Sequence, residues 1–188
     1  MKMVSNFYSD LKQAKVGEGI VLDVLQNCCG RYEFTDVSDD RRYFYKGDID
    51  AYDARNDKHY FLDVKMDSRI AETGNILCEE EVYFENTGEY TPGNMSSDYD
   101  YLAIISTKAR KIYIIDFELL KEHYREGRNY VKNHGEQTTY GTLFSLKKAQ
   151  HYGMIEAVID YEDYQTDRGN AYVPSRIMTW PQTLTEAV

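Results

Sequence analysis

The sequence is poor in cysteine, proline and tryptophan, with three, three and one of them among 188 residues. Three cysteines, of which Cys28 and Cys29 are adjacent, are too few for a disulfide framework and predict reduced thiols in a cytosolic protein. No run approaches the roughly 18 apolar residues that a membrane-spanning helix needs. The first residues also lack the apolar stretch of a secretion signal. We therefore expect a cytoplasmic protein with no membrane partner.

Several catalytic motifs and a global basic charge are missing as well. The chain has neither the Gly-x-x-x-x-Gly-Lys-(Ser/Thr) loop of nucleotide-binding proteins nor the Gly-x-Ser-x-Gly of serine hydrolases. Its four histidines have no spacing typical of zinc ligands. Acidic residues outnumber basic ones by 32 to 22, a net charge of -10, so any contact with nucleic acid must be local or assisted by a metal ion. Basic residues are dense only at 108–111 and 121–132, which predicts either a solvated helix face or a phosphate-binding patch.

What the chain does contain is typical of one globular domain. A hydrophobic fraction of 42% over 188 residues is ample for one buried core. We expect a core over residues 1–132 and a C-terminal extension over 133–188 that packs on the same domain. Hydrophobic spacing predicts, in order, a helix over 7–25, a β-hairpin over 42–52 and 59–65, a loop-rich insert, strands over 101–105 and 111–116, a helix over 117–130, and a strand or helical turn over 154–159. This order predicts the α/β fold class.

The hairpin carries the most distinctive chemistry. Side chains alternate along a strand, so Asp63 and Lys65 share one face, while Leu62 and Val64 share the other. A turn centred on residues 56–57 places Asp50 opposite Asp63, about 4.5 to 5.5 Å away, where the two carboxylates could bind one divalent cation. The alternative is an ordinary polar hairpin face exposed to solvent.

The same residues resemble a known family. Gly47-Asp48-Ile49-Asp50, followed thirteen residues after Asp50 by Asp63-Val64-Lys65, is similar to the two-part acidic motif of the PD-(D/E)XK nuclease superfamily. The resemblance continues through Lys65-Met66-Asp67 and the run Thr73-Gly74-Asn75-Ile76-Leu77-Cys78-Glu79, which is similar to phage-type and Holliday-junction-resolvase-like endonucleases. It covers roughly residues 10–125. It implies a restriction-endonuclease-like core, with a helix, a β-hairpin, further strands and a helix around a mixed central sheet.

The resemblance also implies roles for individual residues. A Mg²⁺ or Mn²⁺ ion would be held by Asp50, Asp63, the carbonyl of Val64 and Glu18 of the first helix. Lys65 would orient or deprotonate the attacking water, or stabilise charge on the phosphate. Two further acids are kept as alternatives or supporting residues: Asp48, which shares a face with Asp50, and Glu79.

These roles predict a divalent-metal-dependent nuclease that hydrolyses phosphodiester bonds in DNA, as an endonuclease or an exonuclease. Two alternatives stay open. One is a non-catalytic module on the same fold that binds protein or nucleic acid, and the other is a nuclease directed at RNA. DNA is the expected partner, and a homodimer is an open alternative to a monomer.

Overall fold

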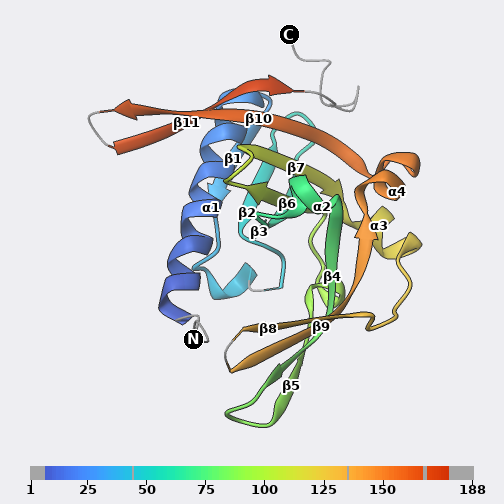
Figure 1. Ribbon diagram of the computed structural model, residues 1–188. Helices are drawn as coiled ribbons and strands as arrows, with labels where there is room; N and C mark the ends of the chain where they lie inside the picture. The colour runs from blue at the N-terminus through green and yellow to red at the C-terminus, as the bar shows by residue number, and fades with distance from the viewer. Residues whose placement is uncertain (1–6, 44, 135, 167–168, 178–188) are drawn as a thin grey trace.

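The computed structural model describes residues 7–43, 45–134, 136–166 and 169–177, and within them it is an α/β fold built on two sheets (Figure 1). The larger sheet contains, in spatial order, β1 (Tyr32–Asp36), β2 (Ile49–Asp53), β3 (Lys58–Met66), β6 (Tyr101–Ser106), β7 (Lys111–Asp116), β10 (Ile155–Thr166) and β11 (Gly169–Ile177). The smaller sheet contains β5 (Glu89–Pro92), β4 (Asn75–Phe84), β9 (Gln137–Ser145) and β8 (Tyr130–His134). In the larger sheet β3 and β6 run parallel and the other neighbours run antiparallel, so the predicted mixed sheet is confirmed.

Helix α1 (Phe7–Cys28) covers one face of the larger sheet. Its buried positions Ile20, Val21, Val24 and Leu25 follow the three- and four-residue spacing that predicted it. A glycine inside a helix costs about 1 kcal/mol relative to alanine, but Gly17 has a packing role. A Cβ atom there would lie 2.7 Å from the Met66 Cγ, so only glycine lets the helix approach β3 this closely.

The opposite face of the larger sheet packs against the smaller sheet and three short helices. These are α2 (Ile70–Thr73), α3 (Phe117–His123) and α4 (Leu146–His151). Asp116 caps α3 by accepting a 2.9 Å hydrogen bond from the Leu119 backbone N–H, and Ser145 caps α4 in the same way. Within the described part of the chain, no helix is long and apolar enough to cross a membrane.

The predicted helix over 117–130 is wrong in its second half. Helix α3 comprises only the first seven of these residues, and Tyr124 is already extended. The cause is a contact from a distant strand, because the Glu80 carboxylate of β4 accepts hydrogen bonds from the Tyr124 hydroxyl and from the backbone N–H groups of Gly127 and Arg128. These bonds hold the segment in a non-helical path on the smaller sheet.

Of the other predicted elements, some are confirmed and some are wrong. The strands over 101–105 and 111–116 are present as β6 and β7, and the segment 154–159 is the start of strand β10. The supposed loop-rich insert instead contains β4 and β5. The segment after residue 133 contributes β9 to the smaller sheet and β10 and β11 to the larger one. Residues 178–188 of the predicted extension lie outside the described residues, and the division at residue 132 stays a prediction.

Candidate metal-binding and active site

The register of the β2–β3 hairpin is set by the side chain at the end of β2. Asp53 is fully buried. Its carboxylate accepts hydrogen bonds from the Arg55 backbone N–H at 3.1 Å and from the Asn56 side-chain amide at 2.9 Å. Asp57 closes the loop with a positive φ of 49°, a conformation that aspartate tolerates better than most residues. The loop is therefore 54–57, and paired residues have numbers that sum to 111.

This register moves Asp50 away from its predicted partner. Asp50 pairs with Phe61 rather than with Asp63, so the predicted register is wrong by two residues. Both oxygens of the Asp50 carboxylate lie 2.9 Å from the Nδ1 of His59. The hairpin therefore engages Asp50 in a local pair with His59, two residue positions closer to the turn than Asp63.

The last pair of the ladder is Ile49 with Leu62, so Asp48 lies just beyond it, beside the segment of β3 that carries Asp63. The Asp48 backbone N–H donates to the Leu62 carbonyl at 2.8 Å, and the Val64 backbone N–H donates to the Asp48 Oδ2 at 2.8 Å. Gly47 makes this approach feasible. It has a φ of 123°, and a Cβ atom there would lie 2.6 Å from the Leu62 carbonyl oxygen.

Lys65 lies beside this pair of carboxylates on the same strand face. Its Nζ is 3.3 Å from the Asp63 Oδ2, and its side chain is 43% exposed where that of Asp63 is 16% exposed. The ammonium group therefore sits closer to solvent than the carboxylates do. Burial alone would lower the pKa of Lys65, but the negative charges of Asp63, Glu79 and Asp48 outweigh it and raise that pKa above its ordinary value.

Glu18, the acid predicted on the first helix, lies in α1, and its role at the site stays a prediction. It is buried, and its Oε2 lies 3.1 Å from the Nζ of Lys15. Its negative charge reaches Asp48: the pKa of Asp48 is raised to about 6 by burial first, then by Asp63, with a smaller effect from Glu18. Asp48 and Asp63 therefore form an acidic cluster, and Glu18 is close enough to Asp48 for its charge to act on it.

Glu79 lies near Lys65 and belongs to a strand, not to a loop as we expected. Its backbone N–H donates a 2.8 Å hydrogen bond to the Asn94 side chain, and a register shift follows it in β4. At this bulge the side chains of Glu79 and Glu80 interact with different partners. The charge of Glu79 acts on Lys65, whereas Glu80 anchors the segment after α3.

The Tyr99 hydroxyl is a buried oxygen without a hydrogen-bond partner among the described residues, whereas the Glu18 Oε2 and Asp63 Oδ2 atoms are paired with the ammonium groups of Lys15 and Lys65. Tyr99 is 2% exposed, and its ring packs on Phe117 with the centroids 4.0 Å apart. Burial raises the pKa of Tyr99, and the charges of Asp63 and Glu79 raise it further, so the hydroxyl lies close to the acidic cluster. Buried polar atoms normally have partners, so the Tyr99 hydroxyl is an exception among the described residues.

The donor set fits a hard divalent cation with few protein ligands. Mg²⁺ typically binds one or two carboxylates and keeps several waters. Asp48 and Asp63 supply two carboxylates, and their mutual repulsion would be relieved by a cation. In the parts of the chain that the structure describes, no group of three or more His, Cys, Asp or Glu side chains is arranged to hold a metal ion. The fit therefore rests on the Asp48–Asp63 carboxylate pair.

Comparison with known proteins gives one structural similarity. No protein-family model matches the sequence, and no curated protein matches it. Among solved structures, the chain is similar to a bacterial homing endonuclease, I-Ssp6803I, with a TM-score of 0.44 and 11% sequence identity. The similarity covers 68% of this chain and 86% of that one.

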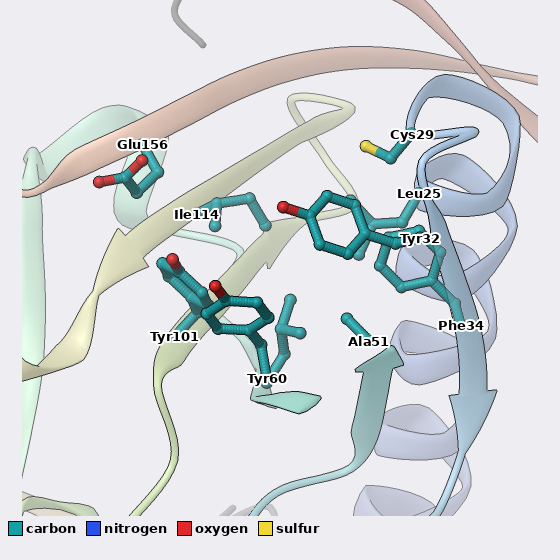
Figure 2. A pocket seen from close by; sticks show the side chains of 10 residues that line it. Leu25, Cys29, Tyr32, Phe34, Ala51, Tyr60, Tyr101, Ile114 and Glu156 are labelled. Atoms are coloured by element: carbon teal, nitrogen blue, oxygen red, sulfur yellow. The ribbon is translucent and has the colours of Figure 1, made fainter. Parts of the chain in front are cut away.

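A cavity lies on the face of the larger sheet that α1 covers. It has a volume of about 50 Å³ and is lined by apolar groups of α1 and the sheet, together with Tyr32, Tyr60, Tyr101 and Glu156 (Figure 2). Leu62 faces it, and Leu62 and Asp63 are neighbours that point to opposite faces of β3. The sheet therefore separates this apolar cavity from the acidic cluster.

Tyr99 is the residue of the site that sequence reasoning missed. It is one of eighteen tyrosines and lies just before β6, without periodicity to mark it. Its burial against Phe117 becomes visible only once the two sheets are packed. The role predicted for the Val64 carbonyl stays a prediction, whereas the Val64 N–H has a defined partner in Asp48.

Proposed function

We propose that this protein is a divalent-metal-dependent nuclease that hydrolyses phosphodiester bonds in DNA, with a site of the PD-(D/E)XK type. The observation that carries the proposal is the convergence of Asp48, Asp63 and Lys65 at the open end of the hairpin. The ordered sequence motifs from Gly47 to Glu79, which resemble that superfamily, support the same reading.

In this proposal Asp48, rather than Asp50, is the strand carboxylate. Asp48 and Asp63 would hold Mg²⁺ or Mn²⁺, with Glu18 and the Val64 carbonyl as the other ligands implied by the resemblance. When bound, such an ion polarises the scissile phosphate and lowers the pKa of a coordinated water. The hydrogen bond from the Val64 N–H fixes the orientation of the Asp48 carboxylate before any ligand arrives.

Lys65 acts in this proposal as a fixed positive charge. Its amine lies beside Asp63 at the solvent-facing side of the site, a position suited to stabilising charge on the phosphoryl oxygens. Its partial exposure places the ammonium group where a phosphate can approach from solvent. Asp63 orients it through the 3.3 Å ion pair.

The proposal is tested by incubating the protein with linear, nicked and branched DNA in Mn²⁺, with EDTA as the metal-free control. Asp63→Asn, purified in parallel, controls for a contaminating nuclease. We expect cleavage of at least one substrate by the wild-type protein, and loss of that cleavage in EDTA and in Asp63→Asn. Absence of cleavage by the wild type on every DNA would overturn the proposal. Equal cleavage by Asp63→Asn and the wild type would show that the activity does not come from the proposed site.

A further inference from the structure

A groove of about 180 Å³ lies between the segment that follows β3 and the smaller sheet. Asp67 and Arg69 form one side, Leu77 of β4 belongs to the floor, and Tyr130 and Lys132 of β8 form the other side. Figure 1 shows β4 running from beside the larger sheet to the lower end of the molecule, where β5, β8 and β9 extend away from that sheet.

The groove is continuous with the acidic cluster along two strands. Asp67 lies two residues beyond Lys65, and its backbone N–H still donates to the Ile105 carbonyl at 2.9 Å, so the chain remains extended there. Leu77 lies two residues before Glu79 on the less buried face of β4. Because side chains two apart in a strand share a face, the Asp67 side and the Leu77 floor of the groove lead to Lys65 and Glu79 beside the carboxylate pair.

The groove also differs from the rest of the molecule in charge. Arg69 and Lys132 are exposed, and within the described ranges neither forms an ion pair. Asp67 is the acid of the lining, and its Oδ1 is engaged by the Arg69 backbone N–H at 2.8 Å. Two cations and one carboxylate leave the lining positive in a chain with a net charge of -10. Tyr130 adds a half-buried aromatic ring.

We propose that this groove binds the sugar–phosphate backbone of DNA next to the bond that is cleaved. Arg69 and Lys132 contact successive phosphates from the two sides, and Tyr130 packs against a sugar or a base. Local cations in an otherwise acidic protein confine the DNA to this path and keep it from binding elsewhere. The inference rests on the proposed nuclease function, since the groove is defined by its connection to the Asp48–Asp63 pair.

The test is DNA binding under conditions without cleavage. Binding of a fluorescein-labelled DNA duplex is measured by anisotropy in EDTA over a series of salt concentrations, for the wild type and for Arg69→Ala/Lys132→Ala. Arg55→Ala/Arg176→Ala is the matched control, because it also removes two exposed cations, at the β2–β3 turn and in β11. Thermal melting confirms that the variants fold.

Each phosphate contact contributes about 0.9 to the slope of log K against log salt concentration. We expect the groove variant to lower the magnitude of the slope by about 2 and the affinity at least about tenfold at moderate salt, and the control variant to change neither. Equal slopes for the groove variant and wild type, or no binding by the wild type, would overturn the inference. Groove-dependent binding of an RNA duplex but not of DNA would overturn the choice of DNA. Groove-dependent DNA binding without any Mn²⁺-dependent cleavage would instead overturn the nuclease proposal alone.

Discussion

The Val64 backbone N–H donates a 2.8 Å hydrogen bond to the Asp48 side chain, and this bond holds the Asp48 carboxylate against the strand segment that carries Asp63. In an antiparallel ladder that N–H would otherwise seek a backbone acceptor. The ladder therefore ends with a carboxylate in place of a carbonyl. The site is built just before β2 begins, and the metal-dependent chemistry proposed for it follows from that placement.

Metal binding should stabilise the protein. A ligand that binds only the folded state at 100 times its Kd adds about 2.7 kcal/mol to the free energy of unfolding. We expect Mn²⁺ at that level to raise the urea midpoint relative to EDTA, and Asp63→Asn to abolish most of the rise. Calorimetry with Mn²⁺ measures the same site directly. An Asp63→Asn variant that binds Mn²⁺ as tightly as the wild type would contradict the carboxylate pair.

The free energy of unfolding without metal should depend on Leu62 and not on Asp63. Leu62 is 4% exposed in the core under α1, so Leu62→Ala should lower the free energy of unfolding by about 2 to 5 kcal/mol. Asp63→Asn in EDTA should cost little or stabilise the protein, because it reduces repulsion with Asp48. Urea denaturation of the three proteins checks both statements. A large loss for Asp63→Asn without metal would make that carboxylate structural.

Tyr99 should limit the stability of the metal-free protein. A buried polar group without a partner costs about 1 to 3 kcal/mol, so Tyr99→Phe should raise the unfolding free energy in EDTA by an amount of that order. The same variant should respond less to Mn²⁺, because the hydroxyl faces the acidic cluster. Tyr113→Phe, at another buried tyrosine of the same core, is the control and should leave the Mn²⁺ response unchanged. Destabilisation by Tyr99→Phe in EDTA would show that the hydroxyl is already satisfied.

The ion pair at the hairpin turn should make the free energy of unfolding depend on pH. The Arg31 guanidinium, 2.5 Å from the carboxylate, is the main cause that lowers the pKa of Asp53 below its ordinary value. A carboxyl whose folded pKa is lowered stabilises the fold above its unfolded pKa of about 3.9, and that contribution is lost as the pH falls through the folded pKa. Asp53→Asn should therefore be less stable than wild type at pH 7, with the difference shrinking towards pH 2. Urea midpoints across this range test it, and a constant difference would contradict the ion pair.

Sequence reasoning found the strands of the site but not their alignment. The β-rich runs that became β2 and β3 were visible, and so were Asp63 and Lys65 on one face. The register depends on which residues form the loop, and Asp53 decides this through side-chain bonds to Arg55 and Asn56. Such side-chain bonds do not produce a periodic sequence pattern. The predicted turn was therefore centred one residue too late, which shifted the expected partner of Asp63 by two positions.

Tertiary contacts account for the other differences. Helical spacing continues past α3, but Glu80 of a distant strand binds the chain from Tyr124 to Arg128 and ends the helix. Glu18 was found through the resemblance, and the structure explains its approach by the contact between Gly17 and Met66. Interactions between residues far apart in the chain are the part that spacing does not encode.

Lys65 should be needed for turnover and not for metal binding, because an ammonium group does not ligate a cation. Lys65→Ala should lower Mn²⁺-dependent cleavage by about 10² to 10³-fold, which is the cost of losing one charge-stabilising group. Lys65→Arg should retain more activity than Lys65→Ala, since arginine keeps the charge but does not act as a base near neutral pH. Undiminished cleavage by Lys65→Ala would refute the role.

The most direct test of the site is Mn²⁺-dependent DNA cleavage by wild type, Asp48→Asn and Asp50→Asn, measured side by side on the DNA that the wild type cleaves best. Loss of even a supporting partner of a metal ligand typically costs about 10- to 100-fold, so loss of a ligand should cost at least as much. The account predicts that Asp48→Asn loses cleavage by this factor or more, while Asp50→Asn, which is paired with His59, stays within a few-fold of wild type. Cleavage by Asp48→Asn at the wild-type rate, with loss of activity in Asp50→Asn, would contradict it.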